Sequence, residues 1–289
     1  MTVLHQTYTL ANGIKIPKLG LGTWLLDDDQ TAEAVKAALA CGYRHIDTAQ
    51  AYGNEAGVGR GLRESGIARE DVFVTTKVAA EHKDYERAAA SIDTSLATAG
   101  LDYFDLIIIH SPQPWKEVNQ SDDHHHEGNR EAWRALEDAL EAGKVRAIGV
   151  SNFLQADLEN ILSTCRVRPM VNQVLAHVGN APFELIDWCR QRDILVEAYS
   201  PVGHGAVLGN AQIAAIAERY GVSVPQLCIR YCLQLGLVAL PKTGNPDHIR
   251  ANAEVDFEIS TADMAALRTV TPITDYGEAS YFPVYGGTL

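Results

Sequence analysis

The sequence predicts an α/β fold in which eight strand–helix units close into a (β/α)8 barrel, with a β-hairpin before the first unit. Short, strand-like apolar runs alternate along the chain with segments whose apolar residues recur at helical spacing. This alternation implies parallel pairing of the strands, and eight units in ~250 residues suit a closed barrel better than an open sheet. No Pro-, Gly- or Ser-rich linker interrupts the 289 residues, so one domain over residues 1–289 is expected.

The hairpin is the first expected element. TYTLANGIKI (7–16) reads as two short strands around Asn12 and Gly13, a pair that favours tight primed turns. Strands of the eight units are then expected at 19–24, 43–49, 71–77, 102–110, 144–152, 168–174, 193–201 and 237–242. Helices are expected at 31–42, 54–66, 85–100, 127–143, 156–165, 181–192, 211–221, 224–236 and about 246–253.

Two stretches do not fit this alternation. The loop SPQPWKEVNQSDDHHHEG (111–128) is long and polar and follows the fourth strand. The tail from about Ile259 carries a helix at 262–270, and its segment 276–285 is expected to close one side of the barrel mouth. Long loops at the carboxyl-terminal ends of barrel strands usually serve function, so this end of the barrel is where a site is expected.

Composition restricts the class of function. The formal net charge of −13 argues against general nucleic-acid binding, which relies on clustered Lys and Arg. The start of the chain lacks the pattern of a signal peptide, and no apolar run approaches the ~20 residues of a membrane-spanning helix. We therefore expect a cytoplasmic protein that has neither a nucleic acid nor a membrane as its partner.

Three further patterns have both a functional and a plain structural interpretation. The five cysteines lie in helical-looking segments without zinc-type pairs, which favours core packing over redox or metal chemistry. Consecutive residues cannot easily direct three imidazoles at one ion, so His124 to His126 predict an exposed polar loop and no metal. GVGRG (57–61) resembles a phosphate loop, but it falls within a predicted helix, where close helix packing is the expected reason for its glycines.

Four residues able to take part in proton transfer fall at the ends of consecutive predicted strands. Asp47 ends the second strand and Tyr52 follows five residues later, while Lys77 ends the third strand and His110 the fourth. A barrel site draws its residues from such strand ends. A phenol has a pKa of ~10, and a nearby ammonium is expected to lower it, so Lys77, held by Asp47, would make Tyr52 a better acid toward a carbonyl oxygen. His110 would donate a hydrogen bond that orients this oxygen.

Each of these residues also has a structural interpretation when taken alone. The alternatives are a purely structural ion pair for Asp47 and Lys77, a packed aromatic ring for Tyr52, and a hydrogen-bonded core histidine for His110. All four at matched strand ends favour catalysis. A Schiff-base lyase built on Lys77 is a second possibility, but it requires a desolvated lysine without a carboxylate partner.

Several segments, in the same order and at the same spacing, resemble the aldo-keto reductase family, especially its bacterial-type, 2,5-diketo-gluconate reductase-like members. They are GYRHIDTAQAYGNEAGVGRGL (42–62), VFVTTKV (72–78), LIIIHSP (106–112), KVRAIGVSNF (144–153), VNQV (171–174), EAYSPVG (197–203) and LPKTGN (240–245). The resemblance implies a TIM barrel and NADPH-dependent reduction of small aldehydes or ketones to alcohols, with Tyr52 as general acid. A noncatalytic nicotinamide-binding member of the same fold remains a third possibility.

The resemblance also implies a set of cofactor contacts on strand ends and the loops after them. Ser151, Asn152 and Gln173 would bond the nicotinamide amide, and Tyr199 would stack on the ring. Ser200 and Val202 would touch the pyrophosphate. The remaining positions implied are Thr23, Trp24, Asp47, Lys242, Thr243, His248 and Asn252. No GxGxxG follows a strand, so the dinucleotide would not be held as in a Rossmann fold.

The sequence departs from the family pattern at two places. The family usually has an arginine at position 248 that pairs with the 2′-phosphate of NADPH, and histidine is smaller and mostly neutral at pH 7. We therefore expect weaker discrimination against NADH. In the substrate pocket, where Trp24, Tyr52, His110 and Ser111 are expected, Ser111 and Ala79 replace tryptophans common in relatives. Trp24 and Trp115 would be the main aromatic walls of an open pocket, and a monomer is expected because no apolar surface stripe is left over.

Overall fold

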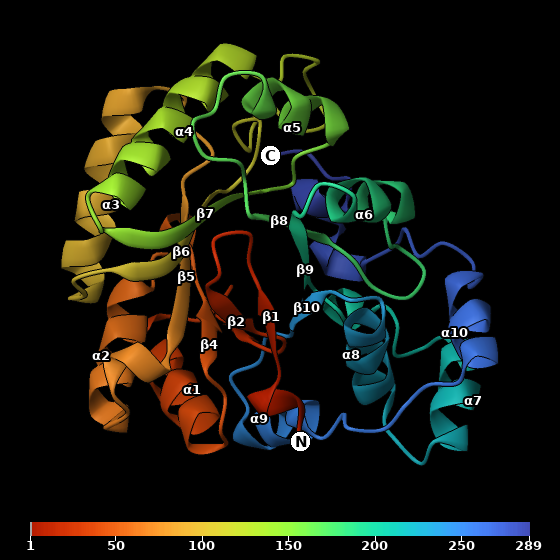
Figure 1. Cartoon of the computed structure of the whole chain (residues 1–289). Helices are drawn as coiled ribbons and strands as arrows, with labels where there is room; N and C mark the ends of the chain where they lie inside the picture. The colour runs from red at the N-terminus through yellow and green to blue at the C-terminus, as the bar shows by residue number, and fades with distance from the viewer. Residues whose placement is uncertain (1) are drawn as a thin grey trace.

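Eight parallel strands form the centre of the structure (Figure 1). In this computed structural model, which describes residues 2–289, they lie side by side in sequence order. Parallel bridges from Leu19 to Ala239 and from Gly22 to Lys242 join the first strand to the last, which confirms the predicted (β/α)8 barrel. The strands are β3 (Leu21–Gly22), β4 (His45–Asp47), β5 (Phe73–Val78), β6 (Phe104–Ile109), β7 (Val145–Ser151), β8 (Val171–Leu175), β9 (Leu195–Tyr199) and β10 (Val238–Leu240).

Helices surround the strands on the outside of the barrel (Figure 1). Every residue of β5 and β6 is buried, as expected for parallel strands covered on both faces. The tail helix α10 lies beside α7, where Asp263 accepts hydrogen bonds from Arg219 and Tyr220. The helices are α1 (Asp28–Ala40), α2 (Glu55–Ser65), α3 (Tyr85–Ala99), α4 (His126–Glu141), α5 (Gln155–Leu162), α6 (Phe183–Arg190), α7 (Ala211–Arg219), α8 (Val224–Gln234), α9 (Pro246–Ala253) and α10 (Thr261–Arg268).

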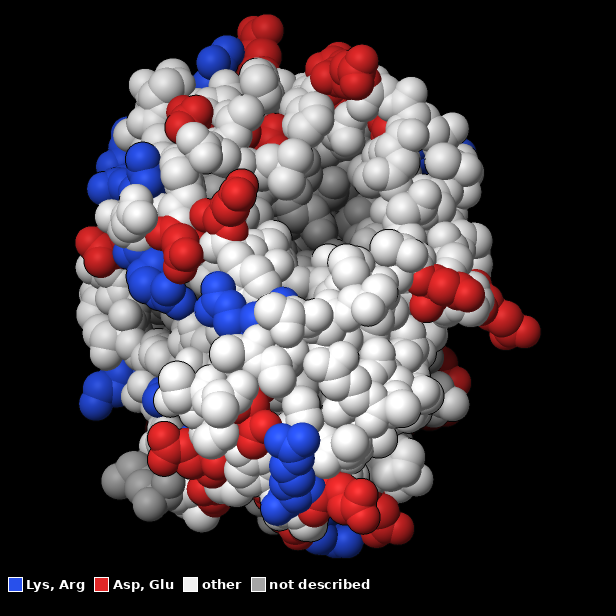
Figure 2. Space-filling view, turned by 90° about the vertical axis from the view of Figure 1, so that its right-hand side faces the viewer, with Lys and Arg blue, Asp and Glu red and all other residues white. Residues whose placement is uncertain are grey.

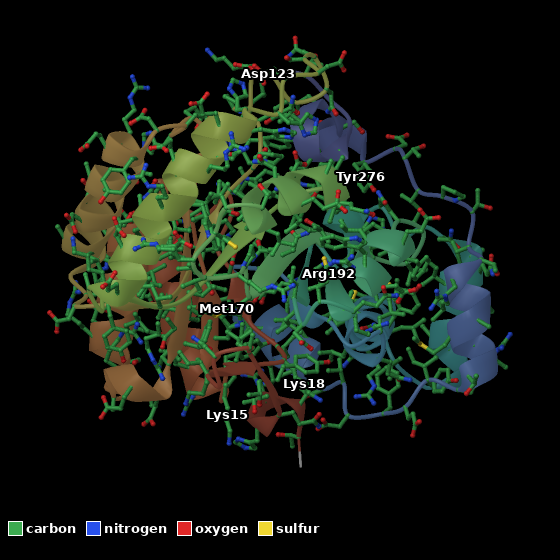
Figure 3. All side chains as sticks on the ribbon, turned by 45° about the horizontal axis from the view of Figure 1, so that its top comes forward. Lys15, Lys18, Asp123, Met170, Arg192 and Tyr276 are labelled. Atoms are coloured by element: carbon green, nitrogen blue, oxygen red, sulfur yellow. The ribbon has the colours of Figure 1, made fainter. Side chains whose placement is uncertain are left out.

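The hairpin of β1 (Thr7–Thr9) and β2 (Lys15–Pro17) covers the amino-terminal end of the barrel. Leu10 and Ile16 are buried there with residues that begin barrel strands, such as Phe73 and Val238. Figure 3 shows Lys15 and Lys18 of this region at the end of the molecule opposite Asp123. The predicted primed turn is wrong, because Gly13 has a positive φ and Asn12 does not. The turn is a three-residue loop in which Gly13 supplies the left-handed position.

The glycines of GVGRG (57–61) bring α2 against its neighbours. A Cβ atom on Gly59 would lie 1.7 Å from the backbone oxygen of Ala99, and one on Gly57 would lie 2.4 Å from that of Asp28. Real Cβ atoms do not approach so closely, so the segment is a close helix contact, as the sequence predicted, and not a phosphate loop.

Three of the cysteines, Cys189, Cys228 and Cys232, are buried and unpaired in the core, in agreement with the predicted packing role. Between residues 2 and 289, none of the helices combines the length and the apolar character that crossing a bilayer would need.

Candidate active site

A cavity of about 230 Å³ opens at the carboxyl-terminal ends of the barrel strands. Strand ends, the loops that follow them and the C-terminal tail line it together. The face drawn in Figure 2 has a deep hollow with a mostly uncharged rim, and the charged side chains lie mainly farther out. The lining residues are Gly22, Thr23, Trp24, Asp47, Ala51, Tyr52, His110, Trp115, Ser151, Asn152, Gln173, Tyr199, Ser200, Leu240, Lys242, Phe282, Pro283, Val284 and Leu289.

The four residues predicted to transfer or assist a proton come together at this cavity. Asp47 ends β4, Lys77 is the penultimate residue of β5, and His110 directly follows β6. Tyr52 ends the short 3-10 turn Gln50–Tyr52 after β4. Asp47, Tyr52 and His110 line the cavity, and Lys77 is fully buried beside them.

The Lys77 ammonium donates hydrogen bonds to three oxygen atoms. Its Nζ donates to Asp47 Oδ1 at 2.5 Å, to the Thr48 carbonyl oxygen at 2.8 Å and to the Tyr52 hydroxyl oxygen at 3.3 Å. Three acceptors use all three ammonium hydrogens. Because the Tyr52 oxygen accepts from Lys77, the proton of Tyr52 is left to be donated to another group.

Burial is the largest influence on the pKa of Tyr52 and raises it, while the Lys77 ammonium lowers it and Asp47 raises it. Lys77 lowers the pKa of Tyr52, as the sequence predicted, but burial outweighs this effect and the resulting pKa lies above the ordinary value of a phenol. Burial also disfavours the charged form of Lys77, but Asp47 and Tyr52 outweigh burial, and the pKa of Lys77 is raised. At neutral pH, Tyr52 therefore keeps its proton and Lys77 its charge.

His110 lies next to Tyr52 in the lining of the cavity. Its ring lies edge-on to Tyr52, with the ring centroids 5.6 Å apart, and edge-on to Trp115 at 5.0 Å. Burial, then the charges of Lys77 and Lys83, place the pKa of His110 well below its usual range. The imidazole is therefore neutral at pH 7, and a neutral imidazole carries one N–H donor.

The predicted nicotinamide contacts line the same cavity, next to the residues predicted to transfer a proton. Ser151, Asn152, Gln173, Tyr199 and Ser200 all line it. The Tyr199 hydroxyl donates to Asn152 Oδ1 at 2.7 Å, and Asn152 Nδ2 donates to the His110 carbonyl oxygen at 3.0 Å. Asn152 and Ser200 both have left-handed backbones, with φ of 62° and 51°. The chain thus turns at Asn152 and at Ser200, directly after β7 and β9 end.

Of the predicted phosphate and adenine contacts, Ser200 and Lys242 line this cavity. Val202, Thr243 and Asn252 are not among its lining residues, and His248 is exposed in the first turn of α9.

Ser111, predicted in the substrate pocket, is buried but is not among the residues that line the cavity. Its carbonyl oxygen accepts a hydrogen bond from Lys83 at 2.7 Å. Its hydroxyl oxygen accepts from the Gln113 main-chain N–H at 3.3 Å, and the residue is not part of the lining that Trp24, Tyr52 and His110 share.

The C-terminal tail closes one side of the cavity. Phe282 packs edge-on against Trp24, with the ring centroids 4.7 Å apart, and the Tyr285 hydroxyl lies 2.7 Å from Ser200 Oγ. Asn119 Nδ2 donates to two tail carbonyl oxygens, which ties the tail to the loop after β6. Only the segment 276–285 as a whole was expected here. The individual wall residues Phe282 and Val284 carried no signal of their own in the sequence.

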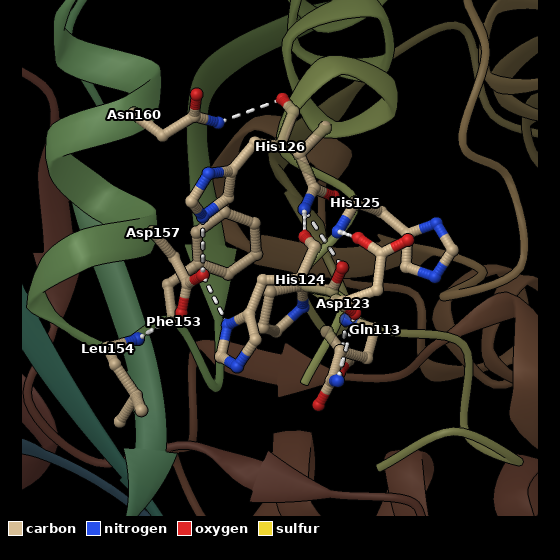
Figure 4. Close-up of polar contacts among 12 residues, drawn as sticks. Gln113, Asp123, His124, His125, His126, Phe153, Leu154, Asp157 and Asn160 are labelled. Atoms are coloured by element: carbon tan, nitrogen blue, oxygen red, sulfur yellow. Dashed lines mark hydrogen bonds and ion pairs between the residues drawn. The ribbon is translucent and has the colours of Figure 1, made fainter. Parts of the chain in front are cut away.

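The three consecutive histidines pair with carboxylates instead of forming a free loop. Figure 4 shows His124 and His126 directed toward Asp157 of α5, at 2.6 and 3.6 Å. His125 lies 2.7 Å from Glu117. The predicted exposed loop is thus partly wrong, because these contacts fasten the 111–128 loop, which carries Trp115, to the start of α5. Across residues 2–289, no group of three or more His, Cys, Asp or Glu side chains has an arrangement suited to a metal ion.

Comparison with known proteins agrees with this geometry. Residues 18–271 match the Aldo/keto reductase family. The chain is 43% identical to a glyoxal reductase of Bacillus subtilis, over 91% of this chain and 92% of the relative. Its fold is similar to an aldo/keto reductase of Brucella melitensis, with a TM-score of 0.83, 39% identity and coverage of 91% and 98% of the two chains.

A third similar protein is an aldo-keto reductase of Bombyx mori in complex with NADP. The TM-score is 0.85, the identity is 31%, and 97% of this chain and 98% of the other are covered. The four residues gathered at the cavity, the closed barrel and these matches agree. The chain belongs to the aldo/keto reductase family.

Proposed function

We propose that this protein reduces aldehydes and ketones to alcohols with NADPH, and that Tyr52 donates the proton. The observation that carries the proposal is the bonding of the Tyr52 hydroxyl. Its oxygen accepts from the buried Lys77 ammonium, while its ring lines the same cavity as His110. The phenolic proton is therefore available to a carbonyl oxygen held between Tyr52 and His110.

The residues around the cavity suit a nicotinamide. The Gln173 side chain donates both amide hydrogens within the protein, to Asp47 and to Glu197, and no donor to its side-chain oxygen Oε1 is found in residues 2–289. That oxygen, at the cavity wall, suits the N–H of a carboxamide. Tyr199 and Ser200 provide the adjoining wall. When bound, the nicotinamide supplies the hydride, which no side chain can carry.

The side chains then handle the proton. His110, neutral at pH 7, donates a hydrogen bond to the substrate oxygen and orients it toward Tyr52. As negative charge develops on this oxygen, the Tyr52 proton moves to it and the product becomes a neutral alcohol. The Lys77 ammonium, 3.3 Å from the Tyr52 oxygen, stabilises the phenolate that forms. Asp47 keeps Lys77 charged and in place, which also argues against Schiff-base chemistry on this lysine.

The walls of the cavity favour uncharged, apolar carbonyl compounds. Trp24, Trp115, Phe282, Val284 and Leu289 line it. Within residues 2–289, Lys242 is the one lysine or arginine of the lining, and it lies on the predicted cofactor side. A carboxylate on the substrate would lose its hydration without gaining a cationic partner. The curated relative named glyoxal reductase supports a small dicarbonyl among the substrates.

The test is NADPH oxidation with a matched pair of substrates. We expect kcat/KM for phenylglyoxal to exceed that for phenylglyoxylate at least ~10-fold, because only the latter brings an unpaired carboxylate into the apolar cavity. Benzaldehyde and simple ketones complete the panel. A preference for the acid would contradict the proposed substrate class, and the absence of NADPH oxidation with every carbonyl compound would contradict the proposed function.

The cofactor preference is expected to depend on position 248. His248 is exposed and lacks the permanent charge and the planar fork of an arginine. The wild type should therefore favour NADPH over NADH by much less than several orders of magnitude. His248→Arg should raise the NADPH/NADH ratio of kcat/KM about tenfold, since arginine bonds a phosphate as a charged fork. Arg250→Ala is the matched control. Arg250 pairs with Asp247, and its loss should leave the ratio unchanged. A wild-type preference of several orders of magnitude would refute this expectation.

Three expectations from the sequence stay predictions: a single domain, a monomer and a cytoplasmic location.

A further inference from the structure

A second carboxyl group lies in the barrel close to Asp47, and the proposed mechanism does not use it. Glu197, in the middle of β9, has no exposed surface. Its Oε2 accepts from Gln173 Nε2 at 2.8 Å, and its Oε1 is buried without a hydrogen-bond partner in the described part of the chain. Gln173 Nε2 also donates to Asp47 Oδ2 at 2.8 Å. The amide nitrogen of Gln173 therefore bridges the carboxyl groups of Asp47 and Glu197.

We propose that Glu197 is a positioning residue of this centre that acts through Gln173. By accepting one amide hydrogen, it holds the Gln173 nitrogen toward the two carboxyl groups and leaves the Gln173 oxygen for the nicotinamide carboxamide. This inference rests on the proposed function, since it assumes that a nicotinamide occupies the cavity.

The orientation of the amide follows from hydrogen-bond chemistry. A glutamine amide has two donor hydrogens on its nitrogen and one acceptor oxygen, and Gln173 uses both hydrogens on Asp47 and Glu197. A flipped amide would place its oxygen against the Asp47 carboxylate, which has no hydrogen to donate to it. Without Glu197, one hydrogen would lose its partner, and rotation about the last side-chain bond, which is soft and roughly two-fold, would be restrained by Asp47 alone.

The charge around Glu197 is compatible with this role. Strand register places Gln173 of β8 on one side and the apolar Val238 of β10 on the other. The charged groups that act on Glu197 across the barrel are Asp47 of β4 and Lys77 of β5. Burial, then the Asp47 charge, raise the pKa of Glu197 to about 8. At neutral pH, Glu197 is mostly an uncharged acceptor, so Asp47 remains the single negative partner of Lys77.

The experiment measures binding of two nucleotides to the full-length protein by isothermal titration calorimetry, which reports binding wherever on the protein the nucleotide lies. Glu197→Met should weaken NADP+ binding about tenfold, as expected for loss of an orienting hydrogen bond. Affinity for adenosine 2′,5′-bisphosphate, which has no nicotinamide, should stay unchanged and also reports folding. The isosteric Glu197→Gln retains an acceptor oxygen and should stay within about twofold of wild type for both nucleotides.

A double-mutant cycle tests whether Glu197 acts through Gln173. Gln173→Met should weaken NADP+ binding at least as much as Glu197→Met, and the double variant no further, because coupled residues are not additive. Additive losses, a Glu197→Met variant with wild-type NADP+ affinity, or equal losses for both nucleotides would overturn the proposal. Glu197→Ala replaces Glu197→Met in the cycle if the latter does not fold. If the wild type binds NADP+ but reduces no carbonyl compound, the proposed function fails while the cycle still decides the role of Glu197.

Discussion

Replacing Lys77 with methionine is expected to lower the free energy of unfolding by ~3–5 kcal/mol at pH 7, because it leaves the Asp47 carboxylate buried without its charged partner. Both side chains of this pair are almost fully buried, and the distance between Nζ and Oδ1 is 2.5 Å. The variant also removes the ammonium that would stabilise the Tyr52 phenolate. We therefore expect the rate of carbonyl reduction to fall as well, by ~100-fold or more.

Urea-induced unfolding measures the loss of stability, and two further variants interpret it. Adding Asp47→Asn to Lys77→Met should recover much of the stability, because the unpaired charge is gone. Lys144→Met removes an ion pair of the same length, to Asp93, that is exposed to solvent, and should cost less than ~1 kcal/mol. If Lys77→Met lowers the free energy of unfolding as little as Lys144→Met does, the buried ion pair does not stabilise the fold.

The convergence of the four residues proposed for proton transfer is the feature of the site that the sequence predicts best. Asp47, Lys77 and His110 lie at or next to strand ends, and the closure of a parallel barrel brings strand ends to one mouth whatever the loop conformations are. The alternation of strands and helices, which depends only on the local spacing of apolar residues, likewise predicted the barrel and each of its helices.

The parts that the sequence did not predict depend on contacts between distant segments. Glu197 lies in an apolar strand, and nothing local indicates that it reaches Gln173. The sign of the Tyr52 pKa shift required the balance of burial against the Lys77 charge, and burial is a property of the folded chain. Ser111 follows His110 directly, yet it is buried and is not part of the cavity lining, because its position depends on contacts of the loop with Lys83 and Gln113.

Tyr52→Phe is expected to reduce the rate of carbonyl reduction by at least ~10²–10⁴-fold, the contribution of a well-placed general acid. The substitution removes one oxygen and keeps the ring that lines the cavity and packs against His110. Lys77 retains its bonds to Asp47 and to the Thr48 carbonyl oxygen, so the fold and nucleotide binding should be preserved. Tyr285→Phe, which removes the hydroxyl that bonds Ser200 at the mouth, is the matched control and should retain most of the activity.

The most direct test of the role of Tyr52 is a single turnover of the Tyr52→Phe variant, with NADPH already bound and a saturating aldehyde. NADPH absorbance then reports the chemical step without product release. We expect a rate at least ~100-fold below that of wild type, together with an unchanged affinity for NADP+. Oxidation of NADPH at the wild-type rate by this variant would contradict the assignment of Tyr52 as the proton donor.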